Sequence, residues 1–116
     1  DLELMSLPHD IGNFNAERHF IAPASGNSMN GGKNPIMDGE LLLLEWVTPT
    51  SAGSISNTTM AIERLDMAGD AEYLLRVIKK QADGKYLLHA NNPDYDDQIA
   101  TSEMKTFARL IKVVRQ

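Results

Sequence analysis

A chain of 116 residues with 42% hydrophobic side chains is long enough for one hydrophobic core and too short for two domains. Its 11 basic and 16 acidic residues give a net charge of −5 at pH 7, which argues against direct, unspecific binding of this domain to nucleic-acid phosphates. The absence of cysteine excludes disulfide and thiolate chemistry and is consistent with a cytoplasmic location, and no apolar run approaches the roughly 20 residues that cross a membrane.

The first 18 residues are expected to form an N-terminal arm before a domain of residues 19–116. The arm contains apolar residues that could form a short strand, which Pro8 ends. Residues 20–24 follow, and Phe20 and Ile21 favour a strand that runs into the next segment.

That segment reads Ser-Gly-Asn-Ser-Met at residues 25–29 and predicts a turn of small residues with two hydroxyl groups. Residues 31–35 form a loop interrupted by glycine and proline, and residues 36–40 form a tight turn. Four consecutive leucines at residues 41–44 then predict a strand buried on both faces, continued through Val47. A serine in a glycine-flanked turn beside a buried strand is a candidate nucleophile.

The second half of the chain favours further strands. A polar connection at residues 48–53 leads to three predicted strands at residues 60–66, 73–80 and 85–90. The pair Asp83-Gly84 between the last two is a strong hairpin signal, and residues 91–97 read as a loop. Residues 107–114 are ambiguous, because their apolar residues recur at helical spacing while Ile111, Val113 and Val114 favour a strand.

Two blocks, Ser-Gly-Asn-Ser-Met and Ile-Met-Asp-Gly-Glu-Leu-Leu-Leu-Leu, resemble the serine peptidase domain of LexA, UmuD and the phage repressors. Weaker matches follow in the same order, including Tyr-Leu-Leu-Arg-Val at residues 73–77 and Asn-Pro-Asp-Tyr at residues 92–95, so that the resemblance covers about residues 20 to 115. It implies a mainly β, single-domain fold, the curved antiparallel sheet of the LexA C-terminal domain and of signal peptidases. It also implies that residues 107–114 form a strand.

The resemblance implies that Ser28 is the nucleophile and that a buried lysine is its general base. Alignment with the family places Leu75 at the lysine position, and leucine cannot accept a proton. Alternation along the strand puts Arg76 on the opposite face, and its guanidinium stays protonated. Lys79 lies about 13 Å along a regular strand from Leu75, so it could replace the lysine only if a bulge near Val77 redirected it.

The backbone N–H groups of Asn27 and Ser28 are the expected oxyanion donors. Ser28 could instead be a turn serine that bonds to nearby backbone. Self-cleaving members also need a scissile bond, usually Ala-Gly or Cys-Gly, before the serine, and no such pair precedes Ser28. Either the chain begins beyond a cleavage site, or no self-cleavage occurs.

Two functions follow from the resemblance. The favoured one is a regulatory or dimerisation module that has kept the serine turn and lost the lysine. It would pair with itself through the C-terminal strand, expected to be an edge strand, and could respond to the RecA filament or be fused to a DNA-acting domain such as a helicase. The alternative is an active self-cleaving peptidase of the SOS or phage repressor type with Ser28 as nucleophile. No metal or cofactor is expected in either case.

Overall fold

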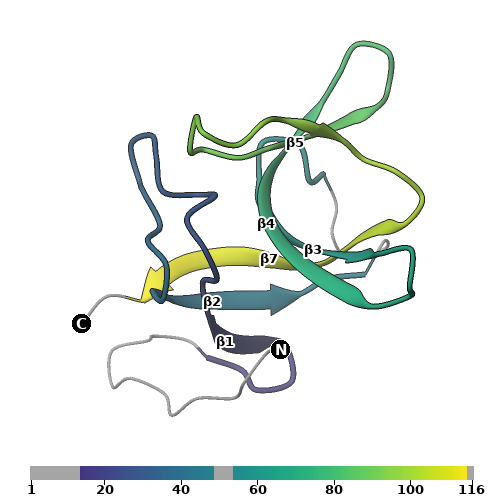
Figure 1. Ribbon diagram of the computed structural model, residues 1–116. Coiled ribbons are helices and arrows are strands. Elements are labelled where there is room, and N and C mark those ends of the chain that lie inside the picture. Colours follow the sequence, from purple (N-terminus) through teal and green to yellow (C-terminus); the bar gives the residue numbers. More distant parts are fainter. Residues whose placement is uncertain (1–13, 49–53, 115–116) are drawn as a thin grey trace.

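The computed structural model describes residues 14–48 and 54–114 (Figure 1). Seven strands form in these residues, and all pair antiparallel within one curved sheet in the order β1-β2-β7-β3-β4-β5-β6 (Figure 1). The prediction of a mainly β domain is confirmed. Their bounds are β1 (His19–Pro23), β2 (Leu41–Trp46), β3 (Thr59–Leu65), β4 (Ala71–Lys80), β5 (Tyr86–His89), β6 (Gln98–Ile99) and β7 (Met104–Val114).

Some sequence-based expectations concern other parts of the chain. The short strand or arm that ends at Pro8 lies outside the described residues, as does most of the polar connection at residues 48–53. Within the described ranges there is no helix of the length and hydrophobicity needed to cross a bilayer.

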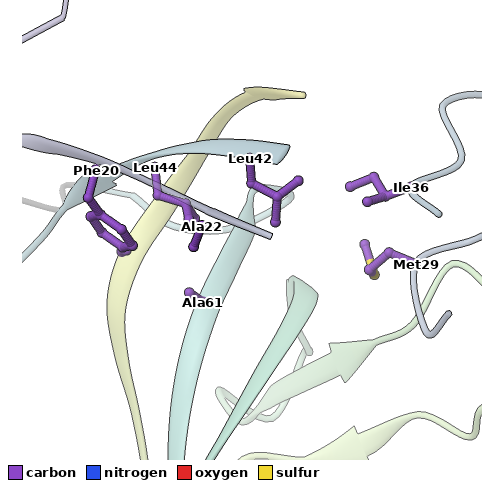
Figure 2. Close-up of a cluster of buried hydrophobic side chains, with 8 residues drawn as sticks. Phe20, Ala22, Met29, Ile36, Leu42, Leu44 and Ala61 are labelled. Atoms are coloured by element: carbon purple, nitrogen blue, oxygen red, sulfur yellow. The ribbon is translucent and has the colours of Figure 1, made fainter. Parts of the chain in front are cut away.

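The four leucines of β2 pack on both faces of the sheet, as predicted. Leu42 and Leu44 belong to the largest core cluster, whereas Leu43 points to the other face and packs in a smaller cluster with Ile21 and Val114. Figure 2 shows Leu42 and Leu44 beside the side chains of the larger cluster. Burial on both faces explains why this strand reads as a continuous apolar run.

The central strand is β7, which pairs with β2 on one side and with β3 on the other. Its register shifts once against each neighbour, so that Ile111 and Phe107 are extra residues in the two ladders. Each extra residue bends a strand and resets the alternation of its side chains. The helical spacing of apolar residues at the C-terminus therefore arises from an irregular strand.

The expectation that residues 107–114 form an edge strand was wrong in part. β7 pairs with β3 as far as Arg109, so its first half is enclosed on both sides, and the edges of the described sheet are β1 and β6. From Leu110 to Val114 the strand pairs with β2, and no described strand pairs with its other side. The reason is that β3 begins only at Thr59, opposite the middle of β7.

The β4–β5 hairpin forms as its Asp-Gly pair predicted. Gly84 adopts a φ of 85°, a conformation that glycine reaches without strain, and the N–H of Gln81 donates to the carbonyl of Lys85 at 2.8 Å. The two-residue strand β6, directly after the predicted loop, was not foreseen from the sequence.

Truncating Leu44 to alanine should destabilise the domain because it leaves a cavity between β1, β2 and β7. Leu44 is 3% exposed, and a Leu→Ala change at such a site costs about 2–5 kcal/mol of unfolding free energy. The matched control is Leu65→Ala, because Leu65 is 46% exposed, and its cost should stay near 0.5 kcal/mol. Urea denaturation measures both values, and equal losses would contradict the assignment of the core.

Candidate functional site

The connection between β1 and β2 carries the predicted serine turn. Its base continues the strand ladder, since the N–H of Ala24 donates to the carbonyl of Glu40 at 2.8 Å and that of Gly39 donates to the carbonyl of Ala24 at 2.8 Å. Met29 and Ile36 are buried in the largest core cluster and point toward Leu42 (Figure 2). These two apolar side chains fix a long loop to the sheet.

Polar contacts hold the turn itself. The carboxylate of Asp38 accepts a 2.7 Å hydrogen bond from the N–H of Gly26, whose φ is 82°. The side-chain oxygen of Asn27 accepts from the N–H of Asp38 at 3.2 Å. The turn at residues 25–29 is therefore held against the turn at residues 36–40, and the direction of the Ser28 side chain is restricted.

A second loop closes on the serine turn from the far end of the sheet. The backbone N–H of Asn92 donates to the carbonyl of Ser28 at 3.0 Å, and its side-chain amide donates to the carbonyl of Asn27 at 2.9 Å. Gly31 lies so close that a Cβ atom there would be 2.4 Å from the carbonyl oxygen of Asn91. Figure 1 shows the β1–β2 and β5–β6 connections side by side above the sheet.

The side chain that reaches the Ser28 hydroxyl is Arg76 of β4. Its Nη1 donates to Ser28 Oγ at 2.9 Å and to the carbonyl of Leu75 at 2.9 Å. Arg76 is 5% exposed, and its Nε is buried with no hydrogen-bond partner. Ser28 itself is partly buried. The hydroxyl therefore meets a guanidinium.

The charge of Arg76 is not neutralised by contact with a carboxylate among the described residues. The guanidinium carbon lies 5.9 Å from the centroid of the Tyr95 ring. Burial lowers the pKa of Arg76 below its ordinary value, the charge of Arg64 lowers it further, and Tyr95 and Glu72 oppose this. Because a guanidinium remains protonated in proteins, Arg76 is a cation and cannot act as a general base.

The structure separates the residues that the sequence proposed for the base. Leu75 packs against the largest core cluster and lines the same pocket as Ser28. Lys79 is exposed, does not line that pocket, and lies on a part of β4 whose register with β3 and β5 runs without a shift. The structure thus has no bulge near Val77 that would redirect Lys79.

Arg76 is the site residue that sequence reasoning set aside. Its β4 neighbours of the same parity, Leu74 and Ile78, do pack on the other face from Leu75. The guanidinium nevertheless reaches Ser28, because an arginine side chain is long and the curved sheet brings the loop to it. A charged residue within the apolar run of β4 was the available signal.

A pocket of 510 Å³ opens in front of Ser28. The apolar side of its lining comes from the sheet and includes Leu42, Leu44, Leu75 and Phe107. Its polar side includes Asn27, Ser28 and Arg76. Asn27 and Ser28, the residues of the two predicted oxyanion donors, both line the pocket, and neither backbone N–H donates a hydrogen bond to any described residue.

The sequence model of the family described as Peptidase S24-like matches residues 4–111 of this chain. The match begins within the predicted N-terminal arm, includes the serine turn, and ends within β7. No curated protein matches the chain.

Substituting Gly31 with alanine should force the two loops apart, since the new Cβ would collide with the backbone of Asn91. We expect a loss of about 1–3 kcal/mol in unfolding free energy, typical of overpacking, and a shifted amide resonance for Asn92. Asn34→Ala, in an exposed part of the same loop, is the control and should change neither. Urea denaturation and NMR measure these effects; a Gly31→Ala variant that matches the control would refute the close contact.

Proposed function

Since the chain belongs to the Peptidase S24-like family, we propose that it is a regulatory or dimerisation module with the LexA-like serine peptidase fold and impaired self-cleavage. The observation that carries this proposal is the hydrogen bond from Arg76 to Ser28 Oγ. A serine hydroxyl attacks a carbonyl only when a base removes its proton. The group beside this hydroxyl is a donor that has no lone pair to offer.

The charge of Arg76 would favour an ionised serine, but it does not supply an acceptor for the proton. No lysine lines the pocket within the described part of the chain. By alignment with the family, Leu75 occupies the lysine position, and the arginine beside it takes the place next to the hydroxyl. Losing a general base costs about 10²–10⁴ in rate, so this arrangement supports impaired rather than ordinary turnover.

The full-length protein should stay intact during long incubation at mildly alkaline pH, where a free amine base would be most effective, and its Ser28→Ala variant should behave identically. Mass spectrometry of the intact protein measures the outcome. Cleavage that occurs in the unmodified chain and disappears in Ser28→Ala would overturn the proposal in favour of an active self-cleaving peptidase.

Two variants provide the positive control and test the alignment. Leu75→Lys and Arg76→Lys each place an amine at the pocket, and each is compared with the same variant carrying Ser28→Ala. The rate of labelling by a fluorophosphonate probe reports how reactive the hydroxyl is. A lysine at the correct position should raise this rate by up to about 10²–10⁴ over the unmodified chain. An unmodified chain that labels as fast as both variants would contradict the loss of the base.

The second half of β7 supports self-association. Between Leu110 and Val114 one side of the strand has no described partner, and Ile111 on this segment is 46% exposed. Unpaired strand edges pair readily with a second chain. In a dimer with a two-fold axis, residues 110–114 of the two copies would pair antiparallel with each other. A dimer of this kind could present the module to a RecA filament or to a fused DNA-acting domain.

Ile111→Asp should raise the dissociation constant of such a dimer about tenfold or more, since like charges facing each other across an interface cost several kcal/mol. Ile99→Asp is the matched control, because Ile99 is 43% exposed on the edge strand β6, which is separated from β7 by three other strands. Sedimentation equilibrium measures both constants. A monomeric unmodified chain, or a dimer that Ile99→Asp weakens as much, would exclude β7 as the interface.

A further inference from the structure

We propose that the pocket in front of Ser28 binds the C-terminal carboxylate of a peptide, with Arg76 as its charged anchor. The inference rests on the proposed loss of self-cleavage, since a site without a base can hold a peptide end without reacting with it. It assigns a ligand to the pocket in addition to the dimerisation role.

The donor inventory of Arg76 is the first argument. A guanidinium has five N–H donors. The two on Nη1 are used by Ser28 Oγ and the carbonyl of Leu75, Nε is buried without a partner, and Nη2 donates to no described residue. A cation that is 5% exposed is costly to bury without an anionic partner. The only ion pair nearby joins Glu72 to Arg64, among the described residues, and leaves Arg76 without a carboxylate.

The shape of the donor set is the second argument. The backbone N–H groups of Asn27 and Ser28 have no described partner, and both residues line the pocket together with Arg76. A carboxylate has two oxygens that accept several hydrogen bonds, and charge-assisted bonds of this type are about twice as strong as neutral ones. Arg76 and these two N–H groups thus provide hydrogen-bond donors and a positive charge for an anionic acceptor.

The opposite wall decides which carboxylate fits. Leu42, Leu44, Leu75 and Phe107 make an apolar surface. Tyr73 also lines the pocket, and its ring centroid lies 5.7 Å from that of Phe107. A phosphate group would leave this surface uncovered. The last side chain of a peptide lies next to its terminal carboxylate, so an apolar final residue would cover the wall while the carboxylate meets the donors.

The test uses two acetylated tripeptides, Leu-Ala-Leu with a free carboxylate and the same sequence ending in an amide, titrated into the full chain by calorimetry. We expect the carboxylate form to bind about tenfold more tightly or better, because hydrogen bonds to a charged group contribute about 1.5–3 kcal/mol. Equal affinities, or no binding of either peptide, would overturn the inference. Acetate that binds as tightly as the peptide would overturn the assignment to a peptide end.

Variants locate the anchor. Arg76→Met has a similar length without the charge and should abolish the preference for the carboxylate, whereas Arg18→Met, which removes an exposed arginine paired with Glu45, should keep it. Circular dichroism checks that each variant folds. If Arg76→Met does not fold, the comparison of the two peptides on the unmodified chain still tests whether the pocket prefers a carboxylate. Mass spectrometry of the titrated samples reports cleavage separately, so an active peptidase would contradict the proposed function without changing the measured preference.

Discussion

The contact between the Arg76 guanidinium and the Ser28 hydroxyl sets the chemical character of this domain. It joins a side chain of β4 to the long connection between β1 and β2, and it buries a positive charge that the described residues do not pair with a carboxylate. A buried cation of this kind is stable only with good hydrogen-bond partners. The hydroxyl and the carbonyl of Leu75 accept from Nη1, whereas neither Nε nor Nη2 donates to a described residue.

The sheet brings the site together through its curvature. Two register shifts bend β7, and one of them places Phe107 in the wall of the pocket. The serine turn is anchored below by Met29 and Ile36 in the core and above by Asn92 from the β5–β6 connection. The position of Ser28 therefore depends on core packing and on two loops far apart in the sequence.

The groups around Ser28 bear on the proposed function. A peptidase site needs an acceptor for the proton of serine, unpaired oxyanion donors and an apolar cleft for the substrate. In this chain the N–H groups of Asn27 and Ser28 have no described hydrogen-bond partner, and both residues line a cleft whose apolar side includes leucines. In place of an acceptor it has a permanent donor. The same geometry that would stabilise a reacting carbonyl is then suited to holding a stable carboxylate, which is why we propose a binding role.

The sequence alone determined the family, the mainly β fold and most of the strands, because short local sequence patterns indicate each of them. The four leucines indicate a strand buried on both faces, Asp83-Gly84 indicates a hairpin, and the Ser-Gly-Asn-Ser-Met turn indicates the candidate site. Only the tertiary structure decided that β7 is enclosed along its first half and that Arg76 reaches Ser28. Strand order depends on pairing between distant segments, and strand alternation describes where a Cβ points but not where a long, flexible arginine side chain ends on a curved sheet.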